Sequence, residues 1–191
     1  MRVLNIGGGA IPMPPFYEHW ERVVLDIDRN TRPDVLMDAR NMGRLPAGEF
    51  DAVYSSHCLE HFYEHEIPGI LAGFVHVLTD NGFADIRVPD LASAIRYAFD
   101  KGLDLTDALY QSPAGPIRLA DMLWGHQPQI KASGQPYMAH RWGFTRATLG
   151  TALKAHFDTV WIAAARLELQ AFAFKAKPDD ELLEWLGLEV N

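Results

Sequence analysis

The sequence is short of cysteine, of basic charge and of long apolar runs, and each shortage excludes a class of protein. Cys58 is the only cysteine, so the chain cannot form an intramolecular disulfide. There are 17 Lys and Arg residues against 25 Asp and Glu, and the net charge of -8 opposes the phosphate neutralisation on which nucleic-acid binding depends. No apolar run approaches the length of about 20 residues that crosses a bilayer. We therefore expect neither nucleic acid nor a membrane as a partner.

Chain length and the composition of the N-terminus predict one soluble domain. The 191 residues suffice for one compact core and are few for two, so residues 1–191 are expected to form a single domain. The chain begins with a strand-like VLNI, without a basic stretch followed by an apolar signal segment. Together with the single cysteine, this start predicts a cytoplasmic location.

Short apolar runs between turn signals predict the buried strands of a mostly parallel sheet. A helix that begins near Pro68 and stops at Asn81-Gly82 is expected before the fifth strand. A further helix is expected to follow a Thr145 cap and to lead into an antiparallel strand pair. The fold class is therefore α/β, with helices on both faces of the sheet. The predicted strands are residues 3–6, 23–27, 35–37, 51–55 and 84–88, and the terminal pair is 160–165 and 169–174.

Residues 93–142 interrupt this pattern with one or two helices and a stretch rich in Gly, Pro and aromatic residues. A long excursion of this kind in a compact domain is often a lid or a binding loop, and we expect an inserted lid or substrate segment here. The alternative is a surface insertion with its own small core. The C-terminal tail has Asp179 as a candidate helix cap, and we expect it to pack on its own sheet. Packing against a second subunit would instead give a homodimer.

The residues that end the first four strands are suited to binding a ligand. In an open parallel sheet, ligands bind at the carboxyl ends of the strands. The first strand ends in Gly7-Gly8-Gly9, which lets a ligand approach the backbone closely, although a tight turn needs glycine equally. Asp26 closes the second strand, where a carboxylate can accept hydrogen bonds from a ribose diol. Asp38-Ala39 closes the third strand and Ser55-Ser56-His57 the fourth.

The stretch SSHCLEHFYEH contains the pattern H-x-x-E-H twice, and this pattern binds zinc when it lies on one helix. The preceding FDAVYSS is strand-like up to Ser56, so His57 falls at the turn where the chain leaves the sheet. His57 and His61 are then not stacked on one regular helix. We therefore expect no metal, and His61 and His65 are interpreted as partly buried or solvent-facing helix residues.

This ordered set of motifs resembles the class I S-adenosylmethionine-dependent methyltransferases, in particular small ones with a bare methyltransferase domain. VLNIGGG is similar to their glycine-rich first motif, VVLDID to their second strand with its acidic end, and FDAVYSSHCLEHF to their fourth-strand signature. The resemblance covers residues 2–90 and 143–176. It implies a Rossmann-like sheet and a methyltransferase that uses S-adenosyl-L-methionine and acts on a small-molecule acceptor.

The resemblance also implies a role for each strand end. Gly7 and Gly9 would line the methionine portion of the cofactor, and Asp26 would hold the ribose hydroxyls. Asp38 and Ala39 would border the adenine. The predicted cofactor-binding set is Gly7, Gly8, Gly9, Asp26, Ile27, Asp38, Ala39, Ser56 and His57.

Two departures from the family pattern affect the cofactor site. Asn5 stands where an acidic residue is usual, and Ile11-Pro12 replaces the last small residue of the glycine motif. Both changes predict a reduced cofactor affinity or a different course of the loop. The chain also starts at the first strand, so a cover for the cofactor would come from residues 93–142 or from a partner subunit.

Histidines are the candidate catalytic residues, because methyl transfer to a protonated acceptor benefits from a base near neutral pH. His57 would lie with Ser56 near the sulfonium and the acceptor. His140 is the second candidate, and His126 is a further one in the insertion. The insertion does not name the acceptor. Its aromatic residues favour a flat or apolar small molecule, or they form the core under a long loop.

Two other classes of protein share part of this pattern. A nicotinamide-dependent oxidoreductase has the glycine turn and the acidic residue after the second strand, but G-x-G-x-x-G requires glycine where Pro12 stands. That class also gives no role to the SSHCLEH stretch. A non-catalytic module that binds S-adenosylmethionine, its product or a partner protein is the second alternative, and the departure at Asn5 favours it.

Overall fold

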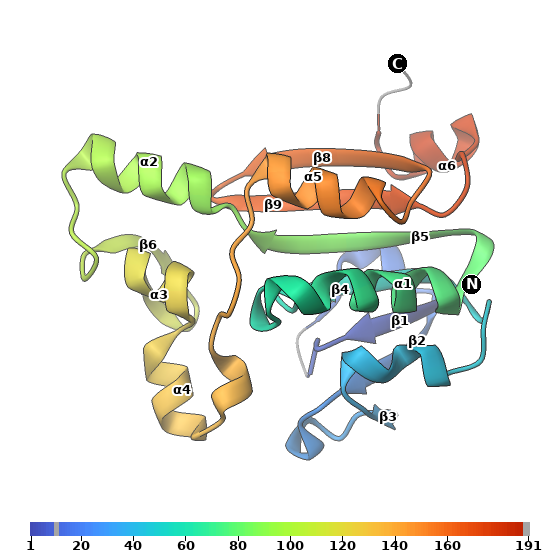
Figure 1. Ribbon diagram of the computed structural model, residues 1–191, viewed down its shortest axis with the longest axis horizontal. Coiled ribbons are helices and arrows are strands. Elements are labelled where there is room, and N and C mark those ends of the chain that lie inside the picture. Colours follow the sequence, from blue (N-terminus) through green and yellow to red (C-terminus); the bar gives the residue numbers. More distant parts are fainter. Residues whose placement is uncertain (10–11, 189–191) are drawn as a thin grey trace.

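A seven-stranded sheet in the order β3-β2-β1-β4-β5-β9-β8 forms the centre of the protein (Figure 1). The computed structural model describes residues 1–9 and 12–188, so Ile11 of the predicted departure lies outside it. β9 runs antiparallel to both β5 and β8, and the other neighbouring strands of this sheet are parallel, which confirms the predicted α/β fold with a terminal antiparallel pair. The strands are β1 (Arg2–Ile6), β2 (Glu21–Asp26), β3 (Val35–Leu36), β4 (Phe50–Ser56), β5 (Leu78–Pro89), β8 (Thr159–Ala165) and β9 (Glu168–Phe174).

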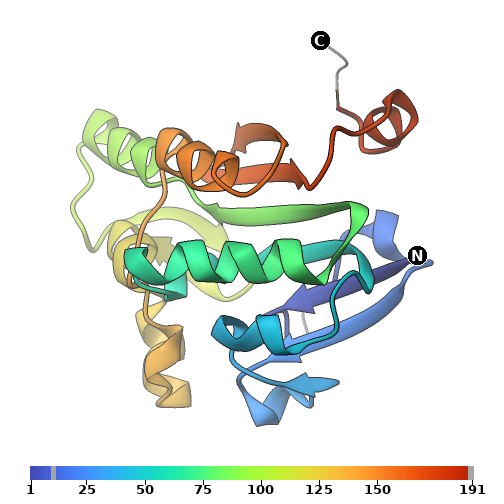
Figure 2. The same ribbon diagram turned by 45° about the vertical axis from the view of Figure 1, so that its right-hand side comes forward.

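Helices cover the two faces of the sheet unequally. The helices α1 (Ile67–Val77) and α5 (Arg146–Lys154) and the short 3-10 segment η3 (Ala39–Arg44) pack on one face (Figure 2). The opposite face carries η1 (Pro15–Tyr17) and α6 (Asp180–Trp185). Three further 3-10 segments lie in the short connections: η2 (Arg29–Thr31), η4 (Leu59–His61) and η5 (Glu64–Glu66).

The alternation of side chains along each strand divides the core into two layers. In β1, Leu4 packs into the larger layer together with Phe74 of α1. Val3 points to the other side, into a smaller layer rich in aromatic residues. There Trp20 stacks on Trp185, with ring centroids 5.8 Å apart. The stacked indoles cover a face on which the connections are too short to form long helices.

The insertion lies beyond the carboxyl ends of the parallel strands, at the left of Figure 1. It begins in α2 (Leu91–Lys101), and its middle forms a two-stranded sheet of β6 (Ala108–Ser112) and β7 (Gly115–Arg118). It has its own small core around Ala98, Leu109 and Met122. The hairpin was not predicted from the sequence. The remaining elements of the insertion are α3 (Leu119–Trp124), α4 (Gln127–Ser133) and η6 (Pro136–Met138).

The predicted boundary between α1 and β5 is wrong. The helix ends at Val77, and β5 runs from Leu78 straight through Asn81-Gly82, where a stop was predicted. Leu78 is fully buried and pairs with Phe50 of β4, and the register shifts before the next pair. Pairing with the neighbouring strand therefore overrides the turn signal in the local sequence.

The predicted helix caps agree with the structure. The Thr145 side chain accepts a hydrogen bond from the amide of Thr148 at the start of α5, and Asp179 caps α6. Asp90 also caps α2, because its carboxylate accepts hydrogen bonds from the amide and the hydroxyl of Ser93. Among the described residues, no helix is long and apolar enough to cross a membrane.

A buried carboxylate on β5 gives the fold a specific dependence on pH. Asp85 is fully buried, and only one of its oxygens accepts a hydrogen bond from the described residues, from Gln170 at 3.0 Å. Burial raises the pKa of Asp85 to about 6, although the charge of Arg87 opposes this rise. The folded state therefore holds this proton at pH values where the unfolded chain has released it. The stability that this proton contributes is lost as the pH rises from about 4 to about 6.

Asp85→Asn is expected to remove that loss. Each pH unit between the unfolded and folded pKa values corresponds to about 1.4 kcal/mol, so the variant should be more stable than the wild type at pH 7.5 by on the order of 3 kcal/mol. At pH 4 the two proteins should differ little. Urea unfolding at both pH values measures the difference. Asp80→Asn on the same strand is the matched control, since the Asp80 side chain is fully exposed. Equal pH profiles for Asp85→Asn and the wild type would contradict the assignment.

Candidate active site

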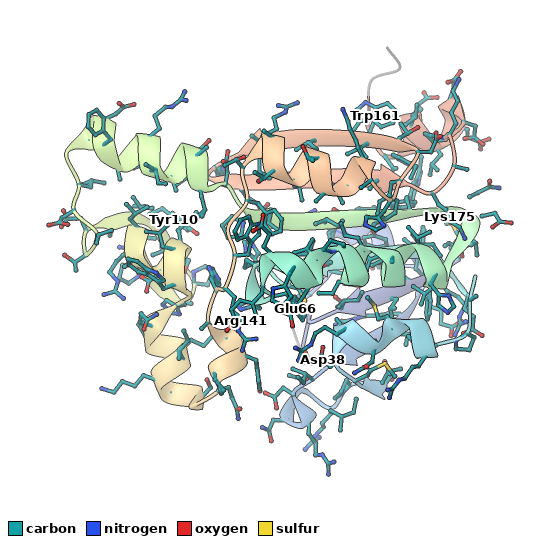
Figure 3. All side chains as sticks on the ribbon, viewed as in Figure 1. Asp38, Glu66, Tyr110, Arg141, Trp161 and Lys175 are labelled. Carbon is teal, nitrogen blue, oxygen red and sulfur yellow. The ribbon has the colours of Figure 1, made fainter. Side chains whose placement is uncertain are left out.

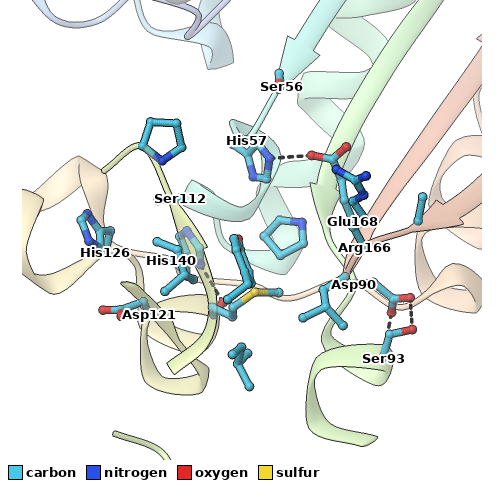
Figure 4. A pocket seen from close by; sticks show the side chains of 18 of the residues that line it. Ser56, His57, Asp90, Ser93, Ser112, Asp121, His126, His140, Arg166 and Glu168 are labelled. Carbon is cyan, nitrogen blue, oxygen red and sulfur yellow. Dashed lines mark hydrogen bonds and ion pairs between the residues drawn. The ribbon is translucent and has the colours of Figure 1, made fainter. Parts of the chain in front are cut away.

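A cavity of about 1200 Å³ lies between the carboxyl ends of the parallel strands and the insertion (Figure 4). That volume exceeds the usual range for small-molecule pockets, roughly 300 to 1000 Å³, so the cavity can hold more than one small group. The cavity brings together six of the residues predicted for the site: Gly7, Gly8, Ser56, His57, His126 and His140.

The glycine turn after β1 is required by close packing beneath it. A Cβ atom on Gly8 would lie 2.2 Å from the side-chain amide of Asn5, which is fully buried. Gly7 and Gly9 both have positive φ angles, 67° and 47°. Any larger residue in this turn would be strained or would displace Asn5. The departure at Asn5 therefore places a neutral amide directly under the loop.

Asp26 is the last residue of β2 and lies beside Gly9, at the carboxyl ends of the strands. It is not on the cavity wall. Its side chain is 8% exposed, and one carboxylate oxygen accepts a hydrogen bond from the amide of Asp28 at 2.8 Å. The predicted neighbour Ile27 lies past the end of β2 and is largely exposed. The strand end thus fixes the Asp26 carboxylate in one orientation and leaves its other oxygen available.

Asp38 and Ala39 lie at the start of η3, also outside the cavity wall. The hydrogen bond from Arg40 lowers the pKa of Asp38, and the guanidinium of Arg40 also pairs with Glu66 at 2.7 Å. Figure 3 shows Asp38 and Glu66 on the side of the sheet that faces Arg141 of the insertion. Asp38 therefore has a structural role in holding Arg40, in addition to its predicted place beside the adenine.

The insertion reaches over the end of β2 through Tyr137. Burial raises the pKa of Tyr137 to about 12, together with a hydrogen bond to Asp28 and the charges of Asp28 and Asp26. On the other side, the amides of Arg141 and Trp142 donate to the carbonyl oxygen of Glu60. The insertion is therefore attached to the sheet on both sides of the cavity.

His57 lies between two carboxylates at the turn after β4. Its φ angle is 50°, and this turn confirms that the chain leaves the strand here and does not enter a regular helix. The Nε2 atom lies 2.8 Å from Glu168 (Figure 4). The Nδ1 atom lies 3.2 Å from Glu60. Burial disfavours the charged ring, but these two carboxylates outweigh it and raise the pKa of His57 to about 10. A doubly protonated ring cannot accept a proton, so the geometry disfavours His57 as a general base.

The His140 ring is neutral, in contrast to the doubly protonated ring of His57. Its Nδ1 atom lies 2.9 Å from the carbonyl oxygen of Met122, so the proton is on Nδ1 and Nε2 carries the lone pair. Burial lowers the pKa of His140, which keeps the ring neutral. The ring packs edge-on against His61, with centroids 4.9 Å apart.

Sequence reasoning missed Glu60 and Glu168. Glu60 is the acidic residue of the first H-x-x-E-H pattern, so the pattern contained a signal that the zinc argument set aside. Glu168 begins β9, more than one hundred residues after His57, and nothing in the local sequence indicates that the two side chains meet.

The comparisons with known proteins concern the family and the fold of the chain. Residues 18–85 match a family model described as a methyltransferase domain. The search of curated protein sequences found no match. A crystal structure of a SAM-dependent methyltransferase from Archaeoglobus fulgidus superposes with a TM-score of 0.59 at 16% identity, and the match covers 91% of this chain and 86% of that one.

Two further structures have the same fold. A crystal structure of an S-adenosylmethionine-dependent methyltransferase from Mesorhizobium loti gives a TM-score of 0.55 at 14% identity, with 91% of this chain and 90% of that one covered. The 1,6-didemethyltoxoflavin-N1-methyltransferase of Burkholderia thailandensis gives 0.50 at 18% identity, with 92% and 71% covered. These findings confirm the predicted Rossmann-like fold and the resemblance to class I S-adenosylmethionine-dependent methyltransferases. They also support S-adenosylmethionine as the cofactor.

Proposed function

Because the chain has the class I methyltransferase fold, we propose that it transfers a methyl group from S-adenosylmethionine to a small-molecule acceptor in the cavity. The observation that carries the proposal is the position of the cavity, which joins the glycine turn and the Ser56-His57 corner to side chains of the insertion. The glycine turn on the cavity wall and the oriented carboxylate of Asp26 suit the cofactor's amino acid and ribose ends.

The residues of this chain supply position and charge more than covalent chemistry. When bound, the cofactor supplies an activated methyl group, and the enzyme's task is to hold the acceptor in line with it and to exclude water. Asp26 and the glycine turn would hold the donor, and the insertion would hold the acceptor. The imidazolium of His57 would fix Glu168 on the cavity wall and the buried Glu60 behind it.

His140 is the better placed of the two predicted catalytic histidines for contact with the acceptor. Its neutral ring has a free Nε2 atom and lines the cavity, whereas both nitrogens of His57 are occupied. A small-molecule acceptor also agrees with the Burkholderia thailandensis neighbour, whose structure contains bound 1,6-didemethyltoxoflavin and S-adenosylhomocysteine.

Ligand-dependent thermal unfolding tests the proposal. S-adenosylmethionine or S-adenosylhomocysteine at about 100 times its dissociation constant should stabilise the protein by about 2.7 kcal/mol, which raises Tm by roughly 5 to 10 °C for a domain of this size. NAD at the same concentration should leave Tm unchanged. Stabilisation by NAD alone would make the protein an oxidoreductase candidate and would refute the methyltransferase proposal.

Formation of a methylated product distinguishes a methyltransferase from the non-catalytic alternative. The protein should convert S-adenosylmethionine to S-adenosylhomocysteine when it is supplied with a fractionated small-molecule extract, and mass spectrometry should find a molecule heavier by one methylene unit. Tight binding without any conversion across all fractions would favour a cofactor-binding module, which the departure at Asn5 already suggests.

A further inference from the structure

Three potential metal ligands from distant parts of the chain meet beside the cavity. Glu60 and His61 follow β4, and His140 comes from the end of the insertion. One ligand atom from each residue lies within 4.8 Å of the other two. Both histidines line the cavity, and Glu60 lies behind them, buried to 99%. The sequence predicted no metal, because the H-x-x-E-H histidines were not expected to share one regular helix and His140 is distant from them along the chain.

The two histidines have the tautomer that metal ligands adopt. The Nδ1 atom of His61 lies 3.3 Å from the carbonyl oxygen of Ala139, and that of His140 lies 2.9 Å from the carbonyl oxygen of Met122. A carbonyl oxygen only accepts, so each Nδ1 carries the proton and each Nε2 has a free lone pair. Second-shell bonds of this kind fix the orientation of a ligating ring and increase its basicity.

The buried Glu60 carboxylate lacks hydrogen-bond donors for its oxygens among the described residues. Neither of its oxygens accepts a hydrogen bond from any described residue, although His57 Nδ1 lies 3.2 Å from one of them in an ion pair. A buried carboxylate is costly unless it is paired and its lone pairs are used. The second oxygen has no such partner among residues 1–9 and 12–188, and one oxygen of this carboxylate lies within 4.8 Å of ring nitrogens of His61 and His140.

We propose that Glu60, His61 and His140 form a binding site for a divalent transition metal, with Zn²⁺ as the best fit. Two imidazoles and one carboxylate suit zinc and other imidazole-preferring ions, and they do not suit Mg²⁺ or Ca²⁺, which prefer oxygen ligands alone. Tetrahedral zinc places its ligand atoms about 3.4 Å apart, so the cluster contracts slightly when the ion binds. Three protein ligands leave a coordination position open toward the cavity.

Main-chain hydrogen bonds hold the segment of Glu60 and His61 against the segment of His140. The amides of Arg141 and Trp142 both donate to the carbonyl oxygen of Glu60, at 2.8 and 3.2 Å. The residue that follows His140 is therefore bonded to the residue that precedes His61. This pairing makes the site a consequence of the fold and not a chance contact between mobile side chains.

The metal gives the cavity a way to activate an acceptor in place of direct contact with the Nε2 atom of His140, and this role rests on the proposed function. A divalent ion at the open position binds an oxygen, nitrogen or sulfur atom and lowers its pKa. The acceptor class would then be a molecule with such an atom, for example a hydroxyl or thiol. Metal binding itself requires neither the methyl donor nor an acceptor, so it is tested separately.

The test measures Zn²⁺ binding to the tag-free full chain after treatment with a chelator. Competition with a chromophoric chelator should show one Zn²⁺ ion bound per chain, without S-adenosylmethionine. His140→Gln and Glu60→Gln should each weaken binding by about 100-fold or more, since loss of a second-shell partner alone weakens metal binding roughly 10- to 100-fold. His65→Gln is the matched control, because His65 is exposed and lies in η5, outside the cluster. It should bind as the wild type does.

Co²⁺ spectroscopy on the wild type keeps the proposal testable if a variant fails to fold. Cobalt in this site should give the visible absorption of a four- or five-coordinate ion, and Zn²⁺ should displace it. Absence of stoichiometric binding, octahedral cobalt alone, or equal loss in His65→Gln would overturn the proposal. Stabilisation of the metal-free protein by S-adenosylhomocysteine would at the same time leave the proposed methyltransferase function intact.

Discussion

Asp26→Ala is expected to weaken the binding of S-adenosylmethionine and S-adenosylhomocysteine by about 100-fold or more. A hydrogen bond to a charged group contributes about 1.5 to 3 kcal/mol, and a ribose diol can donate two of them to this carboxylate. Asp26 is held in place by the amide of Asp28 and lies next to Gly9, so no other described carboxylate at the end of β2 has the same position. Isothermal titration calorimetry with both ligands measures the change.

The control for this prediction is Asp26→Asn. The amide oxygen can still accept from the backbone of Asp28, so the turn should keep its shape while the charge is lost. We expect an intermediate affinity and an unchanged Tm of the free protein. If Asp26→Ala binds both ligands as the wild type does, Asp26 does not hold the ribose and the proposed cofactor site is wrong.

The parts of the fold that the sequence predicted are those with a strong local signal. The buried strand β1 is a short, mostly apolar run followed by glycines, and β8 and β9 are two mostly apolar runs separated by a short turn. Caps such as Thr145 are equally local, because the side chain bonds an amide three residues away. Signals of this kind depend on a few neighbouring residues and survive any tertiary arrangement.

The parts that failed depend on contacts between distant segments. The early start of β5 follows from the pairing of Leu78 with Phe50, which no window of local sequence contains. The partnership of His57 with Glu168 joins β4 to β9, and the cluster with His140 forms only when the insertion folds back onto η4. Sequence reasoning placed residues at strand ends correctly, but it could not say which carboxylate would neutralise which histidine.

This dependence on distant partners makes His57→Ala the most informative stability variant. His57 is the only described cation within an ion-pair distance of the buried Glu60 carboxylate. Breaking a buried pair typically costs 3 to 5 kcal/mol, and because the His57 side chain is half exposed we expect a smaller loss of about 2 kcal/mol. Urea unfolding at pH 7.5 in the presence of a chelator measures the loss without a contribution from bound metal.

The double variant His57→Ala/Glu60→Gln determines whether the loss comes from the carboxylate. If the unpaired charge of Glu60 is the cause, neutralising it should restore part of the stability, and the two substitutions should be less than additive. His65→Ala should change the free energy of unfolding by less than about 0.5 kcal/mol, because His65 is exposed and pairs with no described acidic residue through its ring. Additive losses would mean that His57 and Glu60 stabilise the fold independently. His57 would then support the site only through Glu168, at the start of the strand that closes the cavity from the other side.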